Sequence, residues 1–315
     1  MSMLSRTADH LYWMARYTER AENIARLLEV TYRMSLQLHG TQGGYWGAAL
    51  GITGLQEAYA AKFATIGAAD VLRFMSVDYD NPSSLLASLR SARENCHAVR
   101  GTVTSEVWET INTTWLEARD SAADLVREGV QGSDQTKYFE WVKFRSHLSR
   151  GVTVGTMLQD EAFHFIRLGT FLERADNTAR LLDVKFDELA PQTGASSEYY
   201  EWGALLRSVS AFEIYRKVYR DVITPNRVAE LLILREDMPR SLHACLREAH
   251  QILGLVANGR SNETQRLAGI AYSKLRYGRI EDIFELGLHD YLTDFLGSIA
   301  TIGNRVAQDF LVPMA

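Results

Sequence analysis

Proline and cysteine are scarce in this chain of 315 residues. There are five prolines, and none lies between residues 83 and 190. Because proline breaks helix interiors, this long proline-free stretch predicts long helices. The two cysteines, Cys96 and Cys245, lack the Cys-x-x-Cys or paired Cys/His spacing of a zinc site. A reducing, cytoplasmic location is therefore expected, with no disulfide framework.

The chain also lacks an excess of positive charge and a long apolar run. Its net charge is −5, the wrong sign for a protein that neutralises phosphates, so nucleic acid is not an expected partner. The longest uncharged stretch, residues 34–56, contains six glycines and several polar side chains. No transmembrane helix and no membrane partner are therefore predicted, and the charged N-terminus does not read as a signal peptide.

What the sequence does contain is an internal repeat. Residues 10–30 match residues 164–184 at 10 of 21 positions, at an offset of 154. Residues 46–59 match 202–215 at 6 of 14 positions, and residues 80–92 match 237–249 at 8 of 13, at offsets of 156 and 157. Three blocks in the same order at nearly one offset predict two structural copies, residues 1–155 and 156–315, packed as one compact domain.

Each copy reads as helices, and no alternating apolar run favours a strand. The predicted helices of the first copy lie near 7–38, 45–64, 67–76, 82–100, 104–128 and 135–150, and the second copy repeats them from about residue 157. Asn81 before Pro82, and Thr224 before Pro225, are start signals. The expected fold is all-α, an internally duplicated multi-helix bundle with pseudo-two-fold symmetry.

The first helix has an apolar stripe and an opposite charged side. Helical spacing places Trp13, Met14, Tyr17, Ala21, Ile24, Ala25 and Leu28 on the stripe. Glu19, Glu22, Asn23 and Arg26 lie opposite, and the second copy holds Glu173, Asp176, Asn177 and Arg180 at the same places. Arg20 and Arg174 point about 100° away from the preceding glutamates, so each must find another neighbour.

The polar side changed less between the copies than the apolar side. Trp13 became Arg167 and Ile24 became Thr178, whereas the positions of Glu19, Arg20, Asn23 and Arg26 kept their residues. A solvated face with local ion pairs is the base expectation for charged residues. A buried polar network or a ligand-facing surface explains the retention better, because an unpaired buried charge is costly. All three interpretations stay open from the sequence.

At these two Glu-Arg dipeptides the chain resembles the bacterial alpha-E proteins, all-helical and named for a Glu-Arg motif. The resemblance covers essentially the whole chain, including residues 4–28, 81–100, 172–183 and 237–242. It marks Glu19, Arg20, Glu173 and Arg174 as the motif positions. It implies partnership with a circularly permuted ATP-grasp ligase and a transglutaminase-like protease, in a pathway that forms or modifies peptides.

Two further sets of residues are candidates for binding. The Asp-x-Pro-x-Ser-Leu blocks each open a helix whose N-terminus, with nearby arginines, suits an anion, although capping explains the same residues. This anion-binding set is Asp80, Ser84, Arg93, Asp237, Arg240 and Ser241. Two Glu-x-x-His spacings, Glu94 with His97 and Glu161 with His164, suggest a weaker alternative, a di-metal site of the helical-bundle oxidase type.

The leading functional expectation is an accessory protein that binds the ligase, or its peptide or amino-acid substrate, through the duplicated Glu/Arg/Asn face. No cofactor is expected. The competing expectation is an enzyme of amide-bond formation or cleavage in which Glu19 and Glu173 are general bases. No catalytic nucleophile or phosphate-binding loop is readable in the sequence.

Overall fold

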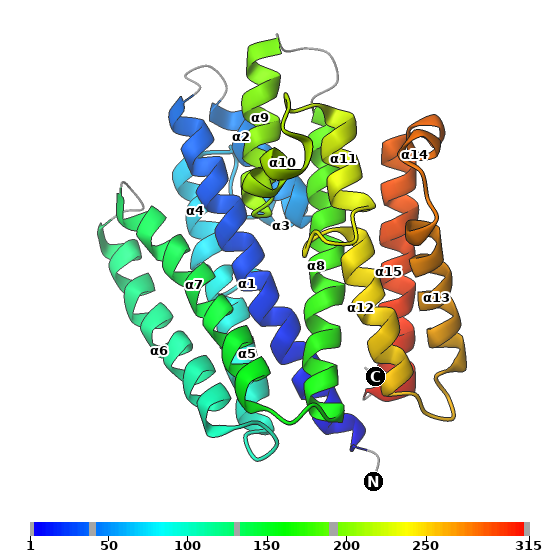
Figure 1. The fold of residues 1–315 in the computed structure, drawn as a ribbon. Helices are drawn as coiled ribbons and strands as arrows, with labels where there is room; N and C mark the ends of the chain where they lie inside the picture. Colours follow the sequence, from blue (N-terminus) through cyan, green and yellow to red (C-terminus); the bar gives the residue numbers. More distant parts are fainter. Residues whose placement is uncertain (1–2, 38–41, 129–132, 189–194, 312–315) are drawn as a thin grey trace. The chain divides into compact units, whose positions relative to one another are not determined.

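The computed structural model describes residues 3–37, 42–128, 133–188 and 195–311. Within these residues there are fifteen helices and no strand, so the fold is all-α as predicted (Figure 1). The chain divides into two compact units, residues 1–170 and 171–315. None of the helices in the described ranges combines the length and apolar character needed to cross a membrane.

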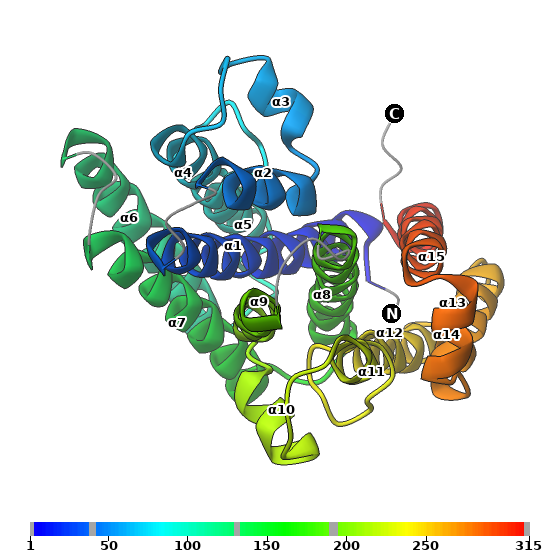
Figure 2. The ribbon, with the colours of Figure 1, turned by 90° about the horizontal axis from the view of Figure 1, so that it is seen from above.

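The first unit is built around four long helices. Its elements are α1 (Ser5–Gln37), α2 (Gln42–Thr53), α3 (Gln56–Ala60), α4 (Ala68–Ser76), α5 (Leu85–Ala98), α6 (Ser105–Glu128), α7 (Ser133–Thr156) and the start of α8 (Glu161–Glu188). Helix α1 packs against α5 and α7, and α6 packs against the same two helices, which closes a four-helix bundle (Figure 2). Helices α2 and α4 pack on α1 beside this bundle.

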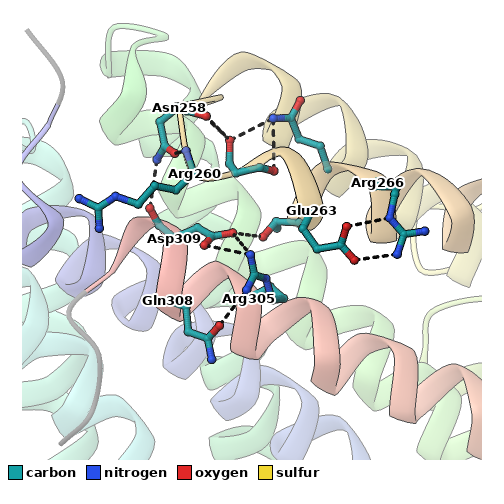
Figure 3. Close-up of polar contacts among 10 residues, drawn as sticks. Asn258, Arg260, Glu263, Arg266, Arg305, Gln308 and Asp309 are labelled. Atoms are coloured by element: carbon teal, nitrogen blue, oxygen red, sulfur yellow. Dashed lines mark hydrogen bonds and ion pairs between the residues drawn. The ribbon is translucent and has the colours of Figure 1, made fainter.

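The second unit begins within α8. Its other elements are α9 (Ala195–Ser208), α10 (Phe212–Tyr219), α11 (Pro225–Ile233), α12 (Leu242–Leu255), α13 (Asn262–Arg276), α14 (Ile280–Leu286) and α15 (Leu288–Phe310). Helix α13 packs against both α12 and α15. Asp309 near the end of α15 accepts hydrogen bonds from Thr264 (2.5 Å) and Arg305 (3.2 Å), while Asn258 donates to its carbonyl (Figure 3). These bonds tie α15 to the α12–α13 turn.

Two tyrosines that the sequence repeat makes equivalent form similar local bonds. Tyr59 is buried, and its hydroxyl donates to the carbonyl of Thr65 at 3.0 Å. Tyr215 is buried in the same way and donates to the carbonyl of Val222 at 2.9 Å. Helices α5 and α12 each contain 14 residues, and their bounds differ by the offset of 157 that the sequence predicts.

Two helix boundaries differ from the sequence prediction, and a third agrees with it. The predicted helix 45–64 is two helices, because Gly54 takes a left-handed φ of +67° and ends α2. The predicted start at Pro82 is wrong, since α5 begins at Leu85 behind the capping residue Ser84. At α11 the prediction is confirmed, because Pro225 is the first helical residue and Thr224 its N-cap position.

The first unit includes the start of α8, up to Thr170. A side chain on Gly169 would overlap the carbonyl of Tyr12 and press on Ala15, so glycine permits this close helix crossing. The backbone N–H of Met3 donates to Glu161 at 2.6 Å and ties the N-terminus to α8.

Candidate functional site

The charged face of α1 is buried in the first unit. Glu19, Glu22, Arg26 and Glu29 follow one another at spacings of three and four residues, so their side chains lie on one face of the helix. Their exposed fractions are 1%, 0%, 6% and 5%. The apolar stripe is also buried at Met14, Ala21, Ile24, Ala25 and Leu28, while Trp13 and Tyr17 are half-buried. Helix α1 is therefore enclosed on both sides.

Glu22 is the centre of a polar network between α1 and α7. One carboxylate oxygen accepts the Nε–H of Arg26 at 2.8 Å. The other accepts the hydroxyl of Ser146 at 2.7 Å and the Nη1 of Arg150 at 2.5 Å. A buried carboxylate needs this number of donors, because its charge has been removed from water.

Arg150 joins the two glutamates of the face. Its Nη1 also lies 3.0 Å from a Glu19 oxygen, and its Nη2 lies 2.8 Å from Nδ1 of His147. The other ring nitrogen of His147 lies 3.2 Å from Nη2 of Arg26. A neutral imidazole has one lone pair to offer, so it accepts a hydrogen bond from only one of the two guanidinium groups at a time.

The ion pairs continue along the same two helices. Glu29 pairs with Lys143 of α7 and, at 2.6 Å, with Arg33 of α1. Arg33 also lies 3.3 Å from Glu140 of α7. We call the full set the α1–α7 seam: Glu19, Glu22, Arg26, Glu29 and Arg33 of α1, with Glu140, Lys143, Ser146, His147 and Arg150 of α7.

The seam balances four carboxylates with four cationic side chains. Removing Glu22 or Arg26, whose side chains are 0% and 7% exposed, would leave an unpaired buried charge, at a cost of about 3–5 kcal/mol. This cost explains why the face tolerates little change. For the charged face of the first copy, the geometry therefore favours a buried structural network.

Glu19 pairs with Arg150, whereas the two motif arginines lie against aromatic rings. The guanidinium of Arg20 lies over the ring of Tyr17, 5.4 Å from its centroid. Arg174 lies over Phe171 in the same way, at 5.5 Å, and also donates to the carbonyl of Pro239 at 3.4 Å. Tyr17 and Phe171 are equivalent in the repeat, so an aromatic ring three residues earlier supports each motif arginine.

The second copy of the charged face is more accessible. Glu173 is only 6% exposed, but the side chains of Asp176 and Arg180 are 27% and 44% exposed, and Asn177 is half-buried. Arg180 donates to Asp176 at 2.9 Å, and this hydrogen bond raises the pKa of the Arg180 guanidinium above its ordinary value. The equivalent groups Glu22 and Arg26 are almost fully enclosed.

The Glu-Arg dipeptides and their helical surroundings agree with a family comparison. A family model described as a predicted alpha-helical domain with a conserved ER motif matches residues 3–311. The chain belongs to the Alpha-E family. Its relatives include uncharacterized proteins from Mycobacterium bovis and two strains of Mycobacterium tuberculosis, each 26% identical over 93% of this chain. The chain spans about a third of those relatives, 35% of their length. No solved structure matches it.

In this Alpha-E chain the anion-binding candidates serve mainly as caps and ion pairs. Ser84 and Ser241 are the N-caps of α5 and α12, and accept the backbone N–H of Ala87 (3.1 Å) and Ala244 (2.9 Å). Asp80 pairs with Lys62, Asp237 with Arg235, and Arg93 donates to Asn112. Arg240 is buried, with 5% of its surface exposed. The structure thus favours the capping interpretation over an anion site.

The two Glu-x-x-His pairs do not converge on a metal site within the described residues. In the described ranges, no three His, Cys, Asp or Glu side chains converge as metal ligands would. Glu94 pairs with Arg90 at 2.8 Å, His97 packs against Trp108, and Glu161 accepts the N–H of Met3. His164 is the remaining member, and its Nδ1 is buried. Local partners thus account for Glu94, His97 and Glu161, whereas the buried Nδ1 of His164 has no hydrogen-bond partner among the described residues.

Sequence reasoning missed the α7 half of the seam. Lys143, Ser146 and Arg150 lie outside the three repeated blocks, so the repeat does not point to them. Their spacing of three and four residues matches that of Glu19, Glu22 and the later charges of α1. A search for a second helix with a complementary polar stripe would have found them.

Proposed function

We propose that this Alpha-E chain is a non-catalytic accessory component of a peptide-forming or peptide-modifying pathway, and that it acts with a circularly permuted ATP-grasp ligase and a transglutaminase-like protease. The accessible part of the duplicated charged face, Asp176, Asn177 and Arg180, binds the ligase. The first copy of that face, which is buried in the α1–α7 seam, has a structural role.

The observation that carries this proposal is the contrast between equivalent residues. Glu22 and Arg26 have 0% and 7% of their side chains exposed, whereas Asp176 and Arg180 have 27% and 44%. Packing explains why the buried copy is retained, but it does not explain why an accessible copy kept the same chemistry. Charged groups at a surface fix the register and specificity of a partner, and a charged partner surface would maintain them.

The experiment compares two double variants. Asp176→Asn/Arg180→Gln removes the proposed contact and leaves no unpaired charge. Glu263→Gln/Arg266→Gln removes a similar helical ion pair in the same unit, 45% and 58% exposed (Figure 3). Each is titrated calorimetrically with a purified circularly permuted ATP-grasp ligase. The first variant should bind about tenfold more weakly, and the second should bind as the wild type does.

Three results would overturn the proposal. They are no complex with the wild-type chain, unchanged binding by Asp176→Asn/Arg180→Gln, or equal loss in the control variant. Thermal unfolding of both variants checks the fold, and each should differ from wild type by less than about 1 kcal/mol because the pairs are exposed.

The competing function, an enzyme with Glu19 and Glu173 as general bases, has less support. A general base must come within hydrogen-bond reach of the substrate. Glu19 is 1% exposed and accepts a hydrogen bond from Arg150, and Glu173 is 6% exposed. Glutamine in place of either residue discriminates the two ideas: an enzyme loses turnover and keeps its stability, whereas a structural network loses stability.

A further inference from the structure

A cavity of about 650 Å³ lies among α13, α14 and α15 of the second unit. Figures 1 and 2 show these three helices side by side. The volume falls in the range of small-molecule sites, roughly 300–1,000 Å³. The cavity shares no residue with the α1–α7 seam or with Asp176 and Arg180, so it requires an explanation of its own.

The cavity has an apolar wall and an apolar rim. Leu275, Ile283 and Phe295 line it and are at most 7% exposed, so they form a packed surface. Tyr277 and Leu286 also line it, yet 74% and 70% of their surfaces are exposed. Large apolar side chains left in water around a cavity are typical of a binding site, because a ligand would cover them.

Three carboxylates surround this apolar surface. Asp282, Asp290 and Asp294 line the cavity, and none of them forms an ion pair in the part of the chain that the structure describes. Asp290 and Asp294 are four residues apart on α15, so they share a helix face. Like charges at this spacing repel one another and weaken the helix. A cation bound between them would remove this repulsion.

The cationic residues that line the cavity do not cancel this charge. Lys274 and Arg279 line the cavity, and Arg279 lies 3.8 Å from Glu281, a residue outside the lining. Three carboxylates against two cationic groups leave a net negative lining. An anionic ligand would face this charge, and a neutral apolar ligand would leave the Asp290–Asp294 repulsion in place.

We propose that this cavity binds a small organic ammonium ion. Its ammonium group lies between Asp290 and Asp294, and its apolar body contacts Leu275, Ile283 and Phe295. Tyr277 and Leu286 cover the outer side of the ligand. This site goes beyond the proposed docking function and does not depend on the ligase.

The test uses three probes with the full chain: phenethylammonium, hexylammonium and the neutral isostere 2-phenylethanol. Each probe is titrated into the protein, and binding is followed by the NMR spectrum of the backbone amides or by calorimetry. At least one ammonium probe should bind saturably and more tightly than 2-phenylethanol, and its binding should weaken as salt is raised.

Substitutions of cavity-lining residues test whether the ammonium probe binds in this cavity. Asp290→Asn/Asp294→Asn should weaken binding of the ammonium probe about five- to tenfold, from the loss of two partly exposed ion pairs. Leu286→Ser should also weaken it, and this variant should fold because Leu286 is exposed. Glu285→Gln is the matched control, since Glu285 is exposed on α14 but does not line the cavity. It should bind as the wild type does.

The proposal is overturned if neither ammonium probe binds saturably, or if 2-phenylethanol binds equally well. It is also overturned if the Asp290→Asn/Asp294→Asn variant keeps full affinity while its unfolding temperature shows that it is folded. Loss of ligase binding by Asp176→Asn/Arg180→Gln has no bearing on these outcomes, so the two proposals fail independently.

Discussion

The guanidinium of Arg150 lies 2.5 Å from the carboxylate of Glu22, so α7 supplies a positive charge for the carboxylate that α1 buries. Ser146 donates to the same carboxylate oxygen at 2.7 Å. The bond from Arg26 to the other oxygen is local, within one helix. The contacts with α7 therefore join two helices that are more than 120 residues apart in the sequence.

Replacing Glu22 with Gln should destabilise the first unit strongly. The substitution keeps the shape but removes the negative charge that faces Arg150 and Arg26. An uncompensated buried charge costs about 3–5 kcal/mol. Urea unfolding measures the loss. Glu94→Gln is the control, because Glu94 forms an exposed pair with Arg90 and should cost less than about 1 kcal/mol. Equal losses in the two variants would show that the seam is not an energetic network.

A second prediction concerns the crossing of α1 and α8. An added Cβ at Gly169 would overlap the backbone carbonyl of Tyr12, which cannot rotate away as a side chain does. Gly169→Ala should therefore destabilise the protein by about 1–3 kcal/mol, although alanine is the better helix former. At Gly151, in α7, a Cβ meets nothing within 4 Å. Gly151→Ala should stabilise by up to about 1 kcal/mol. A stabilised Gly169→Ala variant would contradict the close crossing.

The sequence predicted α1 well because its signals are local. The apolar period and the missing prolines place the helix near 7–38, and the structure has it at Ser5–Gln37. The repeat also pointed to Glu19 and Glu22 as restrained positions. Their partner Arg150 was not predicted, because its pairing depends on how α7 packs and no local pattern reports that.

The sequence also does not predict that the second copy of the charged face is more accessible than the first. Glu22 and Asp176 are equivalent in the sequence repeat, and nothing local distinguishes a 0% from a 27% exposed side chain. Exposure depends on which element covers the helix face. The predicted start of α5 was wrong for a different reason: Asn81 and Ser84 are both good capping residues, and the sequence does not show which of them caps the helix. The Asn81 side chain instead donates to the carbonyl of Phe74 at 3.0 Å, and Ser84 caps the helix.

Both cysteines should be inert in the folded chain. Cys96 and Cys245 are each 0% exposed, and burial raises the pKa of the Cys96 thiol to about 12. Because the thiolate is the nucleophile, neither should react with a disulfide reagent at neutral pH. Two thiols per chain should react at once in guanidinium chloride. Rapid modification of the native chain would show that α5 or α12 opens readily.

The last prediction concerns the pH dependence of stability through His164. Burial lowers the pKa of this imidazole, the positive charge of Arg167 lowers it further, and Asp160 opposes them. In the unfolded chain the same group titrates near its ordinary value, about 6.5. As the pH falls below this value, the unfolded chain binds the proton first, so stability is lost until the lower pKa of the folded state is reached. The free energy of unfolding of the wild type should therefore fall more steeply between pH 7 and pH 5 than that of His164→Gln. Parallel profiles would mean that His164 takes up its proton equally well in both states, which its burial beside Arg167 opposes.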